Sequence, residues 1–244
     1  MKLSVIIPAY NEIETIAEII SKVRAAPLKI TIWSGESHEE QLSMDREIVV
    51  VDDGSTDGTR AYLNSLRDDP DTKIIFHEKN QGKGAAVRTG LQHASGEIML
   101  IQDADLEYDP RDYPKLLKPI LENTAQVVYG SRFRGGPSKA MFYWHMLGNR
   151  FLTFVTNILY NTILTDMETC YKVFSREVSE QLQLTAPGWG FDPEITVQIL
   201  LRGYRIYEVP ISYAGREFEE GKKISWQDGF TVLLTLLKYR ITDF

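Results

Sequence analysis

Short, mostly apolar segments alternate with segments of helical spacing along the first half of the chain. Five segments rich in Val, Ile and Leu are typical of strands covered on both faces: 3–7, 48–51, 73–76, 98–101 and 127–129. Between them, apolar residues recur at helical spacing over 13–23, 61–66 and 85–93, which predicts helices. This alternation predicts an α/β fold, with a mostly parallel sheet flanked by helices.

The second half of the chain has a less regular pattern. Residues 171–174 and 205–209 are further strand candidates, and 226–239 predict an amphipathic helix. Asp192, Pro193 and Glu194 have the order of an N-cap, a first-turn proline and an acid that the helix dipole favours. We therefore expect a helix that begins at Asp192.

A polar stretch, 27–46, separates the first helix from the second strand. It enters the amino end of that strand, whereas ligands of parallel sheets bind at the carboxyl ends. We expect it to be a peripheral insertion.

Polar residues directly follow four of the predicted strands. They stand in the segments 8–12, 52–55, 103–105 and 130–132. Because parallel strands end at the same edge of a sheet, acids from two strands and an arginine from a third are expected to meet in one cleft.

Composition narrows the class of protein. The 244 residues are 43% hydrophobic and 25% charged, which is typical of a folded globular chain. The net charge of −7 argues against a nucleic-acid partner. The single cysteine, Cys170, has no partner for an internal disulfide. We expect neither a signal peptide nor a spanning helix, which needs about 20 apolar residues, and so a cytoplasmic or peripheral membrane location.

Asp103 and Asp105 are the central chemical feature. Carboxylates one residue apart in an extended segment point to opposite sides, so one can hold a sugar hydroxyl while the other binds a hard cation such as Mg²⁺ or Mn²⁺. Glu107 can add another oxygen. An Asp-x-Asp after a strand is also common turn chemistry, as are Asp52 and Asp53 before Gly54.

The loop 80–84 (NQGKG) is similar to a phosphate-binding loop, but its spacing fits neither a P-loop nor a dinucleotide-binding fingerprint. This argues against a P-loop NTPase and a dinucleotide-dependent dehydrogenase.

Together these segments resemble the inverting family-2 glycosyltransferases of the GT-A fold, and most of all the polyprenyl-phosphate sugar transferases similar to dolichyl-phosphate mannose synthase. The resemblance covers nearly the whole chain. It rests on PAYNE at 8–12, VVDDGSTDGT at 50–59, NQGKGAA at 80–86, DAD at 103–105, GSR at 130–132, DMETCYKVF at 166–174 and GKKISWQDG at 221–229.

The resemblance implies roles for individual residues. The positions that match nucleotide-sugar contacts are Pro8, Tyr10, Glu12, Asp53, Lys83 and Asp103. Asp105 matches the metal ligand, and Glu107, where some relatives have glutamine, is the expected second ligand for Mg²⁺ or Mn²⁺. The positions that match phosphate-binding cations of donor or acceptor are Arg132, Arg150, Arg216, Lys222 and Lys223. Lys222 and Lys223 are equally typical of a solvated surface loop.

The acceptor decides whether a catalytic base is needed. A hydroxyl acceptor needs one, whereas a lipid phosphate, with a second pKa near ~6, is already anionic at neutral pH. Asp192 aligns approximately with the base of hydroxyl-acceptor relatives, and its alternative role is the helix N-cap.

Aromatic and apolar residues over 141–147 stand between Lys139 and Arg150, and further ones follow over 151–155, a pattern that suits a membrane surface. A core helix pair is the alternative for 151–164. The helix over 226–239 could lie on a bilayer, pack on the domain or form a subunit contact.

We therefore expect one GT-A domain over 1–244, with a nucleotide-sugar-binding half (1–135) and an acceptor-binding half (136–244). The expected function is metal-dependent, inverting transfer of a hexose from a GDP- or UDP-sugar to a polyprenyl phosphate at the cytoplasmic membrane face. A homo-oligomer or a membrane-protein partner stays open. The alternatives are a hydroxyl acceptor in polysaccharide or glycolipid synthesis and a non-catalytic nucleotide-sugar-binding protein.

Overall fold

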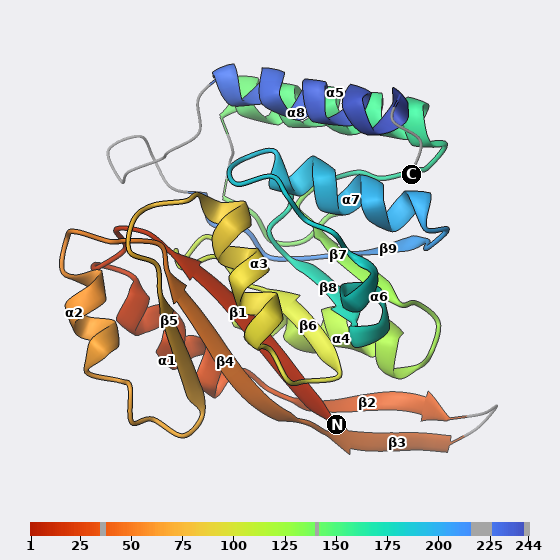
Figure 1. Cartoon of the computed structure of the whole chain (residues 1–244). Helices are drawn as coiled ribbons and strands as arrows, with labels where there is room; N and C mark the ends of the chain where they lie inside the picture. Colours follow the sequence, from red (N-terminus) through yellow and green to blue (C-terminus); the bar gives the residue numbers. More distant parts are fainter. Residues whose placement is uncertain (35–37, 140–141, 216–225, 242–244) are drawn as a thin grey trace.

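A seven-stranded sheet forms the centre of the computed structural model, which describes residues 1–34, 38–139, 142–215 and 226–241 (Figure 1). The strand order is β5-β4-β1-β6-β8-β7-β9. The strands are β1 (Lys2–Ala9), β4 (Asp45–Asp52), β5 (Thr72–Phe76), β6 (Ile98–Ile101), β7 (Val127–Ser131), β8 (Lys172–Ser175) and β9 (Ile206–Pro210). Only β8 runs antiparallel to its neighbours within this sheet, so the predicted mostly parallel α/β fold is confirmed.

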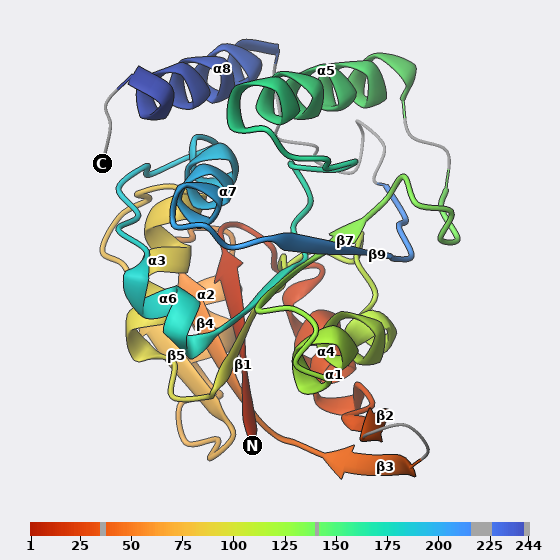
Figure 2. The ribbon, with the colours of Figure 1, turned by 90° about the vertical axis from the view of Figure 1, so that its right-hand side faces the viewer.

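The central strands are apolar because helices cover both faces of the sheet. Val5 and Ile7 of β1 lie beside Ile48 and Val50 of β4 in parallel register, and all four side chains are fully buried. On one face lie α3 (Lys83–His93) and α6 (Arg176–Gln181); on the other lie α1 (Ile16–Ala25) and α4 (Tyr113–Leu121) (Figure 2). The short helix α2 (Thr59–Asn64) packs beside β4 and β5, and a 3₁₀ turn, η1 (Pro110–Asp112), precedes α4. Burial of these apolar strands supplies the main driving force for folding.

The stretch 27–46 forms an antiparallel hairpin, β2 (Lys29–Ser34) and β3 (His38–Ser43), beside the N-terminus. Ile30 and Ile32 are its buried positions, and the Trp33 backbone N–H donates to Glu122 Oε1 at the end of α4 (3.1 Å). The hairpin enters the amino end of β4 (Figure 1). The prediction of a peripheral insertion is therefore confirmed.

A layer of three helices lies above the sheet: α5 (Tyr143–Tyr160), α7 (Phe191–Leu201) and α8 (Trp226–Ile241). In both views α5 and α8 lie side by side over α7. A second apolar cluster joins them, with Met167, Val197 and Leu236 at its centre. Within the described ranges, no helix combines the length and the apolar character that crossing a bilayer requires.

The expected N-cap at Asp192 is wrong. The helix α7 begins at Phe191 after Gly190, and Asp192 lies inside its first turn. The Asp192 carboxylate instead accepts a hydrogen bond from Lys172 Nζ, which is fully buried in β8. A buried ammonium without a counter-charge costs several kcal/mol, on the order of the penalty for an isolated buried ion, so this pairing outweighs a cap worth about 1 kcal/mol.

Glu47 ties three segments together at the amino edge of the sheet. Its carboxylate accepts hydrogen bonds from Ser4 Oγ, from the backbone and side chain of Ser95 and from Gly96 N, and it pairs with Lys2 (3.1 Å). Burial opposes ionisation of Glu47, but these hydrogen bonds outweigh it and hold its pKa at about 2. The ionised form therefore stabilises the fold.

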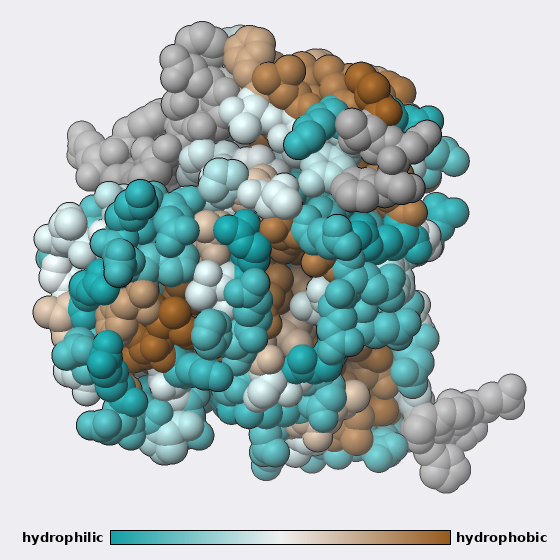
Figure 3. All heavy atoms as spheres, viewed as in Figure 1, coloured by the Kyte–Doolittle hydropathy of each residue, from teal (hydrophilic) through white to brown (hydrophobic). Residues whose placement is uncertain are grey.

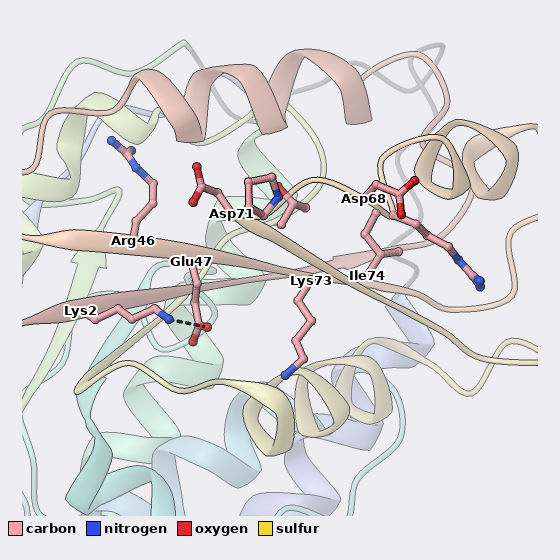
Figure 4. Close-up of a pocket in the computed structure, with 10 residues that line it drawn as sticks. Lys2, Arg46, Glu47, Asp68, Asp71, Lys73 and Ile74 are labelled. Atoms are coloured by element: carbon pink, nitrogen blue, oxygen red, sulfur yellow. Dashed lines mark ion pairs between the residues drawn. The ribbon is translucent and has the colours of Figure 1, made fainter.

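A charged hollow lies next to Glu47 and is lined by residues of the amino edge (Figure 4). Its cations contact the chain itself: Lys73 Nζ donates to His93 O (3.1 Å), and Arg46 donates to Val23 O. The hollow opens at the edge opposite Asp103 and Asp105, so it is not the cleft that the sequence predicts.

We predict that Glu47→Gln lowers the free energy of unfolding by about 1–3 kcal/mol, because it removes charge-assisted hydrogen bonds. A lowered pKa gives stability above the ordinary value of 4.5 that is lost as the pH falls through about 2. The difference in the free energy of unfolding between wild type and variant, measured with urea, should therefore become smaller as the pH falls across this range. Glu18→Gln, in an exposed pair with Lys22, is the control and should change little. A difference that is absent at neutral pH, or that widens in acid, would contradict this role.

Candidate active site

The loops after β1 and β4 are joined at the carboxyl edge of the sheet. Asn11 Oδ1 accepts from Thr56 N (2.8 Å), and Asn11 N donates to Ser55 Oγ (3.0 Å). Asn11 has a φ of 53°, a left-handed conformation that asparagine tolerates. Pro8, Tyr10 and Glu12 are all partly exposed at this edge, as a ligand-binding loop requires.

Asp53 shapes the neighbouring loop. Its Oδ1 accepts from Gln81 N (2.9 Å) and lies 2.7 Å from His77 Nδ1, and its Oδ2 accepts from Gly82 N (2.7 Å). Asp52 Oδ1 accepts more weakly from Ser55 N (3.3 Å). Both acids thus build loops, in line with the turn chemistry of their sequence, and the nucleotide contact of Asp53 stays a prediction.

The NQGKG loop brings a lysine to the first acid of the DAD motif. Lys83 Nζ lies 2.7 Å from Asp103 Oδ1 at the start of α3. Burial alone would lower the pKa of Lys83, but Asp103 outweighs it and raises that pKa; burial would likewise raise the pKa of Asp103, but Lys83 lowers it. Gly82 has a φ of 93°, and a Cβ there would lie 2.4 Å from Pro187 O, so only glycine fits against the segment before α7.

Asp105 and Glu107 face different partners from Asp103. Asp105 Oδ1 accepts from Glu107 N (3.1 Å), and Glu107 Oε2 accepts from the Tyr213 hydroxyl (2.9 Å). Asp105 is 8% exposed, close beneath the surface of the edge. Among the residues that the structure describes, no group of three or more His, Cys, Asp or Glu side chains is placed to hold a metal ion.

Arg132, after β7, is held by an acid that the sequence analysis did not single out. Its Nε and one terminal nitrogen each lie 2.7 Å from an oxygen of Asp166, and the pair is almost fully buried. Burial would lower the pKa of Arg132, but Asp166 raises it. Asn149 Nδ2 of α5 also donates to Asp166 (3.3 Å), so this helix reaches the carboxyl edge beside Arg132.

Unlike Arg132, the other predicted phosphate-binding cations are not seen in a buried ion pair among the described residues. Arg150 is exposed on α5, one position after Asn149 and so about 100° further round the helix. Arg216, Lys222 and Lys223 lie outside the described residues.

The buried pair of Lys172 and Asp192 joins β8 to the first turn of α7, and Glu168 lies on the segment between Asp166 and Lys172. The sequence analysis did not single out Asp166, Glu168 or Lys172. A usable signal was present, because Lys172 interrupts a buried strand, and a charge in such a place requires a partner.

The chemistry of this edge suits a phosphorylated ligand. Asp105 and Glu107 offer hard oxygen donors, whereas Lys83 and the arginines offer positive charge. A divalent cation here would need further oxygens from a ligand or from water, as is usual for Mg²⁺.

Curated relatives match most of the chain. It is 30% identical over 213 residues to "Glycosyltransferase AglJ" of Haloferax volcanii and 31% identical over 227 residues to "Dolichol-phosphate mannosyltransferase" of Pyrococcus furiosus. These alignments cover 87% and 91% of this chain but 63% and 59% of the relatives. The chain thus spans only about three fifths of their length.

Solved structures share the fold. Glucosyl-3-phosphoglycerate synthase of Mycobacterium tuberculosis in complex with UDP superposes with a TM-score of 0.71 at 22% identity, covering 98% of this chain and 80% of that one. The structure of the same enzyme with Mn²⁺, UDP and glucosyl-3-phosphoglycerate superposes with a TM-score of 0.69 at 23% identity. This superposition covers 97% of this chain and 79% of that one. This likeness confirms the GT-A architecture of the sheet and its helices.

The family model described as "Glycosyl transferase family 2" matches residues 4–183, which include every loop of the carboxyl edge from Pro8 to Lys172. The chain belongs to glycosyl transferase family 2.

Proposed function

We propose that this chain transfers a hexose, with inversion, from a nucleotide diphosphate sugar to a polyprenyl phosphate at the cytoplasmic face of a membrane. The observation that carries the proposal is that α5 both reaches the carboxyl edge beside Arg132, through Asn149, and presents an exposed apolar surface on its outer side. The 31% identity to a dolichol-phosphate mannosyltransferase supports the same acceptor class.

In this proposal residues 1–135 bind the donor. Lys83 and Asp103 contact the nucleotide sugar beside the loops that carry Pro8, Tyr10 and Asp53. Asp105 and Glu107 would hold Mg²⁺ or Mn²⁺, since two carboxylates suit a hard cation that takes its other oxygens from a diphosphate and water. When bound, the cation neutralises charge on the departing diphosphate.

Residues 136–244 bind the acceptor. An oxygen of the lipid phosphate attacks the anomeric carbon from the side opposite the diphosphate, and the bond from that carbon to the diphosphate oxygen breaks. Because the phosphate is already anionic, no side chain has to remove a proton. Arg132 and Arg150 would orient the two phosphate groups, together with Arg216, Lys222 and Lys223 from the family resemblance.

Asp192 is poorly placed to act as a base. Its carboxylate is bonded to Lys172, and both side chains are almost fully buried. If Asp192 took up a proton, the buried ammonium of Lys172 would lose its counter-charge. This supports an acceptor that needs no base.

The outer side of α5 and α8 suits a membrane surface. The residues of this outer apolar face are Tyr143, Trp144, Leu147, Phe151, Phe154, Ile158, Phe230, Leu234, Leu237 and Ile241, all of them exposed. Figure 3 shows the part on α8 as a brown area at the top of the molecule. The helix α5 contains no Asp or Glu. Exposed cations lie before α5 (Lys139), within it (Arg150) and in the last turn of α8 (Lys238 and Arg240). Apolar side chains bordered by cations fit an anionic headgroup layer.

The metal role predicts the behaviour of Asp105→Asn. We expect transfer to be lost, and nucleotide-sugar affinity to become insensitive to Mn²⁺, whereas the affinity of wild type should rise when Mn²⁺ is added. Asp68→Asn, exposed at the opposite edge, is the matched control and should behave like wild type. Titration calorimetry and transfer assays with and without EDTA measure both effects. Full wild-type activity in EDTA would refute the metal role.

The acceptor is tested by supplying radiolabelled nucleotide sugars to vesicles that contain a polyprenyl phosphate and counting label in the extracted lipid. We expect Arg150→Ala to lower the initial rate about 10–100-fold, as the loss of a charge-assisted phosphate contact should, and Asp192→Asn to keep substantial turnover. In Asp192→Asn the amide oxygen can still accept from Lys172. Arg205→Ala, exposed at the amino end of β9, is the control.

The opposite order would indicate a hydroxyl acceptor, because losing a general base typically costs about 10²–10⁴-fold. Asp192→Asn as the most damaged variant, with unchanged circular dichroism, would therefore overturn the lipid-phosphate mechanism.

Two exposed tryptophans test the membrane surface. Trp144 is 77% exposed in the first turn of α5, and Trp33 is 54% exposed on the peripheral hairpin. We expect Trp144→Glu to weaken sedimentation with anionic vesicles about tenfold or more, through lost apolar contact and added repulsion, and Trp33→Glu to have no effect. An acid in the first turn of a helix is favourable, so α5 should stay folded. Equal loss in both variants, or in neither, would contradict the assigned surface.

A further inference from the structure

Glu168 is a carboxyl group that the proposed mechanism does not use. It lies between Asp166, which binds Arg132, and Lys172, which binds Asp192. Its Oε1 is completely buried and has no hydrogen-bond partner among the described residues, although Glu168 as a whole is partly exposed. Few polar atoms of a folded protein are left in this state, and each one calls for an explanation.

The charges around Glu168 are already paired with one another. The groups that act on it are Asp166 of its own segment, Arg132 after β7, Lys172 of β8 and Asp192 of α7. These two cations and two anions cancel, so neither of the two cations is left to neutralise an ionised Glu168. Burial, followed by Asp192, raises the pKa of Glu168 to about 8 against the opposing effect of Lys172 and Arg132. Near neutral pH the side chain is therefore mostly the uncharged acid.

The position of Glu168 is next to the donor residues. Two positions further along, the Cys170 thiol donates to Ile101 O (3.7 Å) at the end of β6, two positions before Asp103, which itself pairs with Lys83. Glu168 also shares charged neighbours with this pair, because Asp192 acts on both Glu168 and Lys83, and Lys172 acts on both Glu168 and Asp103. In the proposed function, the space between this pair and Arg132 is where the hexose joins the diphosphate to the acceptor.

We infer that Glu168 recognises the donor hexose by a hydrogen bond between its uncharged carboxyl group and a sugar hydroxyl. This inference rests on the proposed function. An uncharged acid both donates and accepts, as a hydroxyl does, so the two groups are complementary without a change of net charge. A phosphate is better matched by the unpaired cation Arg150 than by a group enclosed between two neutralised pairs.

Binding measurements separate the sugar from the nucleotide. Titration calorimetry with Mn²⁺ compares GDP-mannose with GDP, and UDP-glucose with UDP, for wild type, Glu168→Gln and Glu168→Ala. We use whichever of these two nucleotides wild type binds. For it, we expect Glu168→Ala to weaken the affinity for the nucleotide sugar about tenfold and to leave the affinity for the free nucleoside diphosphate unchanged. Glu168→Gln, which also donates and accepts, should stay within about threefold of wild type. Glu180→Ala, exposed on α6, is the control.

The pH dependence gives a second readout that a purely structural role would not move. As the pH rises through about 8, wild type should lose its preference for the nucleotide sugar over the free diphosphate, while Glu168→Gln should keep it. Loss of transfer in Glu168→Gln with unchanged binding would make Glu168 a base and overturn the inference. So would equal weakening of sugar nucleotide and free diphosphate in Glu168→Ala, or no weakening at all. If wild type binds no nucleotide sugar at all, the proposed function itself fails.

Discussion

The need to neutralise buried charge organises the carboxyl edge of this protein. Three ion pairs meet there: Lys83 with Asp103, Arg132 with Asp166, and Lys172 with Asp192. Breaking a buried pair typically costs about 3–5 kcal/mol, because one charge stays behind without compensation. Each pair therefore fixes the position of the segments that carry it. Lys172 holds the first turn of α7 against β8, and Asp166 joins the end of β7 to α5 through Asn149.

Much of the fold can be predicted from the sequence, because its central strands are continuous apolar runs and polar residues follow them at once. The neighbours Val5 and Ile6 point to opposite faces of the sheet and are both fully buried, and that is what the pattern states most clearly. The edge that carries Asp103 and Asp105 follows from the topology alone. The sequence predicts that the stretch 27–46 is peripheral. It does not predict that this stretch forms a hairpin, since its strands are polar and lie outside the main sheet.

Charge pairing is what the sequence pattern conceals. Arg132 and Asp166 are 34 positions apart, and Lys172 and Asp192 are 20 apart, so no local spacing connects them. For this reason the sequence predicts Arg132 as a phosphate contact, although most of its hydrogen bonds go to Asp166. It likewise predicts Asp192 as a helix cap, although the Asp192 carboxylate accepts a hydrogen bond from Lys172. Glu168 has no signal of its own, because its environment exists only after its segment has met Arg132 after β7 and Asp192 of α7. The same network joins the end of β7 to α5, because Asp166 accepts from both Arg132 and Asn149.

The configuration of the product tests the central claim most directly. The account predicts that a nucleotide sugar with an α-linked hexose and a polyprenyl phosphate yield a lipid-linked hexose joined through phosphate in the β configuration. Proton and phosphorus NMR of the purified lipid product measure both the linkage and the anomeric centre. A β-linked sugar phosphate is the predicted result. An α-linked product, a sugar joined through a hydroxyl oxygen, or free hexose as the sole product would contradict direct attack by the acceptor phosphate.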